Sequence, residues 1–164
     1  MDKSAATLTT SFTLNGEIVQ VEPTPGERLS HSLRERLDRK DVKIGCNAGD
    51  CGACTVLLDG EQVCSCLVPV AQVAGRDVTT VEGLAGTDGR LSDLQQAFHE
   101  YGAAQCGICT PGFLVAAKDL LERNDNPSET EVRYWLAGNL CRCTGYDKII
   151  RAVMDTAADM RGAA

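Results

Sequence analysis

Nine cysteines in a chain of 164 residues constrain the fold of this protein more than any other feature of its sequence. The odd total excludes a simple set of internal disulfides. The chain begins MDKSAATLTTSF, which has no cationic stretch followed by an apolar core, so we expect no general secretory signal and a cytoplasmic location. In a reducing cytoplasm, metal ligation explains this cysteine content better than disulfides do.

Four cysteines form a first group with the spacing C-x4-C-x2-C-x11-C: Cys46, Cys51, Cys54 and Cys66. Plant-type ferredoxins hold a [2Fe–2S] cluster with ligands spaced in this way. Three thiolates on one loop can surround a cluster only if the backbone curls tightly, and Gly45, Gly49 and Gly52 permit that curl. Structural zinc is the alternative, but zinc ribbons usually pair two similar C-x2–4-C knuckles. The spacing therefore favours an iron–sulfur cluster.

A second group has the spacing C-x2-C-x31-C-x-C: Cys106, Cys109, Cys141 and Cys143. A C-x-x-C pair alone could be a thioredoxin-like redox site, but such a site needs a βαβ context, which the helical surroundings lack. Four ligands of a second cluster explain the pattern better. Thr110 and Thr144 follow the two pairs and suit helix N-caps, so we expect the thiolates at helix N-termini, where the helix dipole favours negative charge.

The ninth cysteine and the two histidines belong to neither group. Cys64 precedes Cys66 by two residues on the same face of a strand, so it could replace Cys66 as a ligand. The matched spacing favours a small, buried, apolar role for Cys64 instead. His31 and His99 lie on helical stretches, and we expect surface or core imidazoles there with no metal role.

The first half of the chain has the pattern of a small sheet. Strand-like runs surround Asn15–Gly16 and Asp59–Gly60, and these pairs favour type I′ hairpins because both central residues need a positive φ. Between the hairpins, residues 27–37 carry a leucine at every fourth position, which predicts a helix with one apolar stripe. Residues 77–84 indicate another short strand.

The second half of the chain is predicted to be helical. A small, polar break at residues 84–90 indicates a domain boundary near Gly86. Four helices are expected, beginning at about Ser92, Pro111, Ser128 and Gly145. The first and third open with capping boxes, in which a serine is followed three residues later by Gln or Glu. We therefore expect an α+β chain with a ferredoxin-like [2Fe–2S] domain over residues 1–85 and a helical [2Fe–2S]-binding domain over residues 86–164.

Charge and hydropathy exclude several classes of function. The formal net charge of −7 and the lack of a basic segment argue against a nucleic-acid surface. No apolar run approaches the length of a membrane span. We find no activated nucleophile, no acid–base pair and no open substrate metal, so the chain alone is not expected to be catalytic.

Three motifs carry a resemblance that covers nearly the whole chain: GCNAGDCGACTV, QCGICTPG and GNLCRCTGY. With these motifs the chain resembles the small iron–sulfur subunit of the xanthine oxidase family of molybdenum hydroxylases. The resemblance implies a β-grasp, plant-type ferredoxin fold for the first domain. For the second domain it implies an all-α four-helix bundle that holds the second [2Fe–2S] cluster.

The resemblance also implies an electron path and partners. In the family, electrons leave a molybdenum–pterin on a large subunit, pass the cluster of the helical domain and then the plant-type cluster, and reach FAD on a medium subunit. By carry-over, Gln105 and Cys143 contact the pterin. The implied pterin form is molybdopterin cytosine dinucleotide, and the implied assembly is a heterotrimer, often doubled.

The substrate is not encoded in these residues. The overall resemblance favours an N-heteroaromatic substrate for the holoenzyme, and carbon monoxide, aldehyde and hydroxybenzoyl-CoA oxidoreductases are the alternatives within the family. A stand-alone electron carrier is a further alternative, although one cluster would suffice for it. An iron–sulfur regulator should carry a nucleic-acid face, which the acidic balance disfavours.

Overall fold

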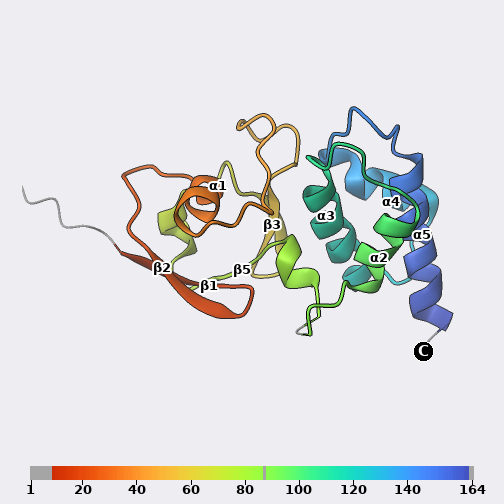
Figure 1. Cartoon of the computed structure of the whole chain (residues 1–164), viewed down its shortest axis with the longest axis horizontal. Helices are drawn as coiled ribbons and strands as arrows, with labels where there is room; N and C mark the ends of the chain where they lie inside the picture. Colours follow the sequence, from red (N-terminus) through yellow and green to blue (C-terminus); the bar gives the residue numbers. More distant parts are fainter. Residues whose placement is uncertain (1–8, 87, 163–164) are drawn as a thin grey trace, which may run out of the picture.

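The computed structural model of the protein describes residues 9–86 and 88–162. Figure 1 shows a sheet-containing half and a helical half that lie side by side. One mixed sheet has the strand order β2-β1-β5-β3-β4, in which β1 and β5 are parallel and the other neighbours are antiparallel. The strands are β1 (Thr10–Leu14), β2 (Glu17–Val21), β3 (Thr55–Leu58), β4 (Glu61–Cys64) and β5 (Asp77–Thr79). The predicted combination of strands and helices is confirmed.

Both predicted hairpin turns are present. Asn15 and Gly16 have φ values of 51° and 86°, and Asp59 and Gly60 have φ values of 51° and 82°. Two successive positive φ angles are the signature of a type I′ turn, whose twist matches that of the flanking strands. These turns fix the register of β1 against β2 and of β3 against β4.

The strand expected over residues 77–84 is shorter than predicted. It ends at Thr79, and a 3-10 turn, η3 (Val81–Leu84), follows it. The Asn15 side chain explains the change, because its Oδ1 accepts a hydrogen bond from the Thr80 N–H at 2.8 Å and its Nδ2 donates to the Thr80 hydroxyl at 3.0 Å. The amide that would continue the ladder is therefore bound to a side chain.

The helix expected over residues 27–37 is formed by two short pieces. These are α1 (Leu29–His31) and a π-helical turn, η1 (Ser32–Arg36). The Leu37 N–H donates to the Ser32 carbonyl, five residues earlier, at 3.1 Å. Leu29 and Leu33 are fully buried, and they belong to the same apolar core as the inner residues of the sheet.

The second half contains four α-helices, as predicted: α2 (Asp93–Glu100), α3 (Thr110–Arg123), α4 (Glu129–Trp135) and α5 (Asp147–Gly162). Both capping boxes are present, Ser92 with Gln95 and Ser128 with Glu131. Two further 3-10 turns are η2 (Val70–Val73) and η4 (Leu136–Gly138). Within residues 9–86 and 88–162, no helix is long and apolar enough to cross a membrane. The expectation of no secretory signal concerns residues 1–12, of which residues 1–8 lie outside the described residues.

Two apolar cores hold the halves together through β3. Val56 and Leu58 belong to the core beneath α1, whereas Leu57, on the opposite face of β3, belongs to the core of the helical half. Because successive side chains of a strand point to opposite faces, β3 is buried on both sides. Leu84 also packs into the helical core. The sheet therefore lies directly against α3, as Figure 1 shows.

A polar contact at Arg123 adds to this apolar junction. The Arg123 Nε lies 2.6 Å from Oδ1 of the buried Asp119, and its Nη2 lies 2.9 Å from Glu61 at the start of β4. The guanidinium group also lies over the Trp135 ring, 6.0 Å from the centroid. One side chain thus links α3, α4 and the β3–β4 hairpin.

A buried carboxylate organises the α1 region. Glu27 accepts hydrogen bonds from Arg36 Nε and Nη2 at 2.7 Å each, from the Ser32 hydroxyl at 2.5 Å, and from the Thr24 N–H at 3.0 Å. The Arg36 guanidinium group holds the pKa of Glu27 well below its usual range, and the bonds from Ser32 and Thr24 add to this effect although burial opposes it.

Replacing Glu27 by Gln tests this network. Because the folded-state pKa of Glu27 lies below its ordinary value of 4.5, the ionised carboxylate stabilises the fold above that pH, and the contribution is lost as the pH falls towards the lower value. We expect Glu27→Gln to lower the free energy of unfolding at neutral pH by about 1–2 kcal/mol, since Arg36 is partly exposed. Urea titrations should show a flatter loss of stability under acid conditions. A pH profile parallel to that of the unchanged protein would contradict the assignment.

Candidate metal centres

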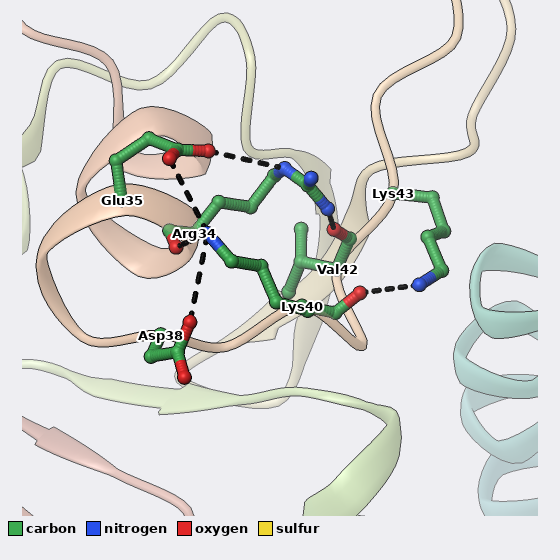
Figure 2. A network of polar contacts seen from close by, with 6 residues as sticks. All are labelled: Arg34, Glu35, Asp38, Lys40, Val42 and Lys43. Carbon is green, nitrogen blue, oxygen red and sulfur yellow. Dashed lines mark hydrogen bonds and ion pairs between the residues drawn. The ribbon is translucent and has the colours of Figure 1, made fainter.

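The first cysteine loop enters from a segment that is fixed by polar contacts. Figure 2 shows Arg34 Nη1 donating to the Val42 carbonyl, at 2.7 Å, and Lys43 Nζ donating to the Lys40 carbonyl, at 2.5 Å. Lys40 also pairs with Glu35, at 3.3 Å. These bonds hold the chain between η1 and the loop, so the loop starts from a defined position.

The loop itself curls through three residues with positive φ: Asn47 at 55°, Gly49 at 87° and Gly52 at 68°. The prediction for Gly49 and Gly52 is confirmed, and Asn47 is an addition that the sequence analysis missed. Asparagine tolerates this conformation better than most residues do. Gly45 serves differently, because a Cβ there would lie 2.8 Å from the Cys51 Sγ.

Backbone N–H groups of this loop point at sulfur. The Cys46 Sγ accepts hydrogen bonds from the N–H groups of Ala48 and Asp50, each at 3.3 Å, and the Cys51 Sγ accepts one from the Cys46 N–H at 3.3 Å. The N–H groups of Ala48, Cys51 and Asp50 lower the pKa of Cys46 to about 7, because they stabilise its thiolate. The exposed edge of the site therefore favours the ionised sulfur that binds metal.

The inner thiols of the first group lie in a different environment. Cys54 and Cys66 are buried, and they lie beside each other. Burial, followed by the neighbouring Cys54 thiol, raises the pKa of Cys66 to about 11. A metal that binds here must displace protons, as metal binding by thiols generally requires.

The second group is brought together from two segments, residues 106–109 and residues 141–143. Cys109 is the N-cap residue of α3 and is buried, whereas Cys106 and Cys143 are exposed, with their Sγ atoms 3.6 Å apart. Burial, followed by the neighbouring Cys141 thiol, raises the pKa of Cys109 to about 12. The structure therefore contains two close sulfur pairs here, Cys106 with Cys143 and Cys109 with Cys141.

The prediction that the threonines act as N-caps is wrong. Thr110 is the first residue of α3, behind the Cys109 N-cap, and its buried hydroxyl has no partner among the described residues. Helix α5 begins only at Asp147. The Thr144 hydroxyl donates to the Cys141 Sγ at 3.0 Å instead, and its N–H donates to the same sulfur at 3.4 Å. The Thr144 hydroxyl therefore bonds to the Cys141 sulfur and does not cap a helix.

Thr144 also sets the acidity of its neighbour. Burial opposes ionisation of Cys141, but the hydrogen bonds from the Thr144 hydroxyl and N–H outweigh it and lower the pKa of Cys141. Of the predicted helix N-terminus positions, only that of Cys109 is confirmed. The positive end of the α3 dipole lies at this thiol.

The remaining candidates lie as follows. Cys64 is half-buried beside the first group, with its Sγ 3.7 Å from the Gly49 carbonyl, and burial raises its pKa. His31 and His99 are exposed, in agreement with surface imidazoles. Gln105 is exposed immediately before Cys106, so it shares a surface with the Cys106–Cys143 pair.

The sulfur geometry fits a two-iron cluster better than a single ion. Within the described residues, no three His, Cys, Asp or Glu side chains converge closely enough to hold one metal ion. A [2Fe–2S] cluster has four cysteine ligands spread over two irons, so it requires two close pairs per site. The first group offers Cys46 with Cys51 and Cys54 with Cys66. The unpartnered Thr110 hydroxyl beside the second group could donate to a cluster sulfur.

The two cysteine loops meet each other. The Leu140 N–H donates to the Cys51 carbonyl at 2.9 Å, and the Asn139 Nδ2 donates to the Gly52 carbonyl at 2.9 Å. A Cβ at Gly112 would lie 2.2 Å from the Gly52 oxygen, so only glycine allows α3 this close. Asn139 and Gly112 were not predicted as contact residues, because their one signal in the sequence is a position beside cysteine motifs.

A mixed sheet with three cysteines on one loop and a fourth after β4, together with a helical half that carries a second cysteine group, defines an iron–sulfur protein of two cluster-binding parts. Comparison with known families agrees. Residues 12–83 match a 2Fe-2S iron-sulfur cluster binding domain, and residues 80–154 match a [2Fe-2S] binding domain.

Known relatives then identify the family. The chain is 46% identical to the small FeS subunit of nicotinate dehydrogenase from Eubacterium barkeri, over 89% of this chain and 92% of that protein. Its structure is similar to quinoline 2-oxidoreductase from Pseudomonas putida 86, with a TM-score of 0.87, 43% identity and coverage of 94% of this chain and 96% of that chain. It also matches aldehyde oxidoreductase from Desulfovibrio desulfuricans ATCC 27774, with a TM-score of 0.88, 46% identity and 94% coverage of this chain, but spans only 17% of that one.

The chain therefore belongs to the small iron–sulfur subunits of the xanthine oxidase family of molybdenum hydroxylases. It is an electron-transfer subunit of an oxidoreductase complex. The resemblance seen in the cysteine motifs is confirmed.

Because Gly112 lies so close to the Gly52 carbonyl, we expect a Gly→Ala substitution there to destabilise the protein. Gly→Ala inside a helix normally adds up to about 1 kcal/mol of stability. At Gly112 the added Cβ collides with backbone, so we expect Gly112→Ala to lower the free energy of unfolding by about 1–3 kcal/mol. Gly138→Ala is the control, because nothing lies within 4 Å of a Cβ there. Equal urea midpoints for the two variants would show that the approach is not restrictive.

Proposed function

We propose that this chain relays electrons one at a time from a molybdenum–pterin on a large partner subunit, through two [2Fe–2S] clusters, to FAD on a medium partner subunit. The proposed ligands of the first cluster are Cys46, Cys51, Cys54 and Cys66. Those of the second cluster are Cys106, Cys109, Cys141 and Cys143. The observation that carries the proposal is the grouping of these eight thiols into close pairs on two loops that touch.

We propose two domains, each of which holds one of the two clusters. Residues 1–85 would form a β-grasp, plant-type ferredoxin domain, and residues 86–164 a four-helix-bundle domain. The two separate apolar cores, to both of which β3 contributes side chains, support this division. Residues 1–8, 87 and 163–164 of these ranges lie outside the described residues.

The protein's own groups prepare each site for a cluster. A [2Fe–2S] cluster with four thiolates supplies reversible one-electron storage as an anion of about −2 when oxidised. Three features favour negative charge on sulfur. The Cys46 thiolate accepts from the N–H groups of Ala48 and Asp50, and the Cys141 sulfur accepts from the N–H and hydroxyl of Thr144. The Cys109 sulfur lies at the N-terminus of α3. Burial of Cys54, Cys66 and Cys109 keeps water from the inner sulfurs.

The second cluster is the proposed entry point for electrons. Gln105 and Cys143 are exposed together and would contact the pterin, in the form of molybdopterin cytosine dinucleotide. Ile108 and Leu140 add apolar side chains that are 46% and 54% exposed and are adjacent in sequence to Cys109 and Cys141. Exposed apolar side chains beside a redox site are suited to contact with a partner subunit.

The proposed assembly is a heterotrimer or its doubled form, located in the cytoplasm, where nine unpaired cysteines remain reduced. An N-heteroaromatic substrate is supported by relatives named as subunits of nicotinate, nicotine and caffeine enzymes and by the quinoline enzyme. The aldehyde oxidoreductase match favours an aldehyde as the second candidate substrate.

The ligand assignment has a direct chemical test. The purified chain should contain about four iron and four sulfide per polypeptide, and its reduced form should show two paramagnetic centres in electron paramagnetic resonance (EPR) spectra. We expect Cys66→Ser to remove or alter one centre, because Cys66 is a proposed ligand. Cys64→Ser, at a half-buried cysteine of the same strand region, should keep both centres. Loss of a centre in Cys64→Ser alone would reverse these two assignments.

The assembly has its own test. We expect the native protein to elute in size-exclusion chromatography as a large species that contains molybdenum and flavin. Gln105→Glu, which places a negative charge at the proposed pterin contact, should change the EPR signal of the second cluster more than that of the first. A lone small species in native extracts would favour a free electron carrier instead.

A further inference from the structure

The two cysteine loops are joined by a short seam of hydrogen bonds, formed by Cys51 and Gly52 on one side and Asn139 and Leu140 on the other. The Leu140 N–H donates to the Cys51 carbonyl at 2.9 Å. Cys51 is a proposed ligand of the first cluster, and Leu140 directly precedes Cys141, a proposed ligand of the second. One hydrogen bond thus connects the two ligand sets through the backbone and side-chain bonds of Cys51, Leu140 and Cys141.

The next residue of each loop forms a second contact. The Gly52 carbonyl accepts hydrogen bonds from the Asn139 Nδ2 at 2.9 Å, from the Thr55 hydroxyl at 2.7 Å and from the Thr55 N–H at 3.1 Å. Asn139 is 3% exposed and Thr55 is 7% exposed. Water therefore does not compete for these bonds, and a buried hydrogen bond holds its partners more firmly than an exposed one.

The seam tolerates little movement. A Cβ at Gly52 would lie 2.4 Å from the Gly138 carbonyl oxygen and 2.6 Å from the Asn139 Nδ2. Gly112 of α3 packs closely against the Gly52 carbonyl. The Asn139 amide is the one side chain of the second loop that donates to this carbonyl within the described residues, so it fixes the position of Leu140 relative to Cys51.

We propose that the Leu140 N–H···O=C Cys51 hydrogen bond is the route by which electrons pass between the two clusters, and that Asn139 is the positioning residue that holds it. The inference rests on the proposed function, because it needs a cluster in each cysteine group. With both clusters bound, one electron would leave the second cluster, which would thereby be oxidised, and would enter the first, which would thereby be reduced. No bond breaks and no proton moves. Electron tunnelling decays less steeply through covalent and hydrogen bonds than across gaps, so this contact couples the two centres.

The test removes a single backbone donor. In the purified complex, Leu140→Pro deletes the N–H, and Leu140→Ala keeps it while removing the same half-exposed side chain. Asn139 has φ −112° and ψ 121°, a conformation that a following proline accepts. Flash photoreduction followed by spectroscopy of the two clusters measures how fast electrons redistribute between them. We expect several-fold slower redistribution in Leu140→Pro, with both EPR signals and both midpoint potentials retained, and wild-type behaviour in Leu140→Ala.

A second variant tests the positioning role without touching the backbone. Asn139→Ala should also slow redistribution, whereas Asn126→Ala, at an exposed asparagine between α3 and α4, should not. This variant carries the test if the proline variant loses a cluster. Wild-type rates in Leu140→Pro or in Asn139→Ala with both clusters present would overturn the proposal.

Two further outcomes separate the inference from the proposed function. Loss of a cluster in both Leu140→Pro and Asn139→Ala would overturn the inference, because the seam would then serve assembly of the sites. A wild-type protein with fewer than two paramagnetic centres would instead overturn the proposed function itself.

Discussion

The Gly52 carbonyl is the point where the two cysteine loops are fixed to each other. A buried carbonyl must be hydrogen-bonded to avoid a large desolvation cost, and here Thr55 and Asn139 supply the donors. The Asn139 donor comes from a residue far away along the chain. Helix α3 can lie close to the Gly52 carbonyl because Gly112 has no side chain. The two cysteine loops are consequently held in contact by backbone groups that cannot move independently. The apolar contacts at β3 and the polar contacts of Arg123 also hold the two halves of the chain together.

Each cysteine group combines an exposed edge with a buried interior. At the edge, N–H groups stabilise the thiolate of Cys46, and the pKa of this thiol is lowered to about 7. In the interior, burial raises the pKa of Cys66 and of Cys109, so a metal bound by these thiols would have to displace their protons. Cluster binding at the proposed ligands would thereby offset the cost of ionising buried thiols. The same burial excludes water from the inner sulfurs of a bound cluster.

Local patterns were read correctly from the sequence where the interactions that decide them are local. The hairpins at Asn15–Gly16 and Asp59–Gly60 depend on adjacent residues, and each capping box depends on a serine and the residue three positions later. The N-cap roles assigned to the threonines failed, because the Thr144 hydroxyl bonds to the Cys141 sulfur and Cys109 takes the cap position of α3. The strand after residue 77 ended early because the Asn15 side chain, from the turn after the neighbouring strand β1, accepts a hydrogen bond from the Thr80 N–H.

The spacing of eight cysteines was enough to predict two iron–sulfur sites, since ligand number and spacing are written directly along the chain. The family was also readable from the three cysteine motifs, and the comparisons confirm it. Only the tertiary structure determined which sulfurs lie next to each other and how the two sites touch. Gly52 and Asn139 are 87 residues apart, and a hydrogen bond between them depends on the packing of α3 against β3, which no local pattern of residues specifies.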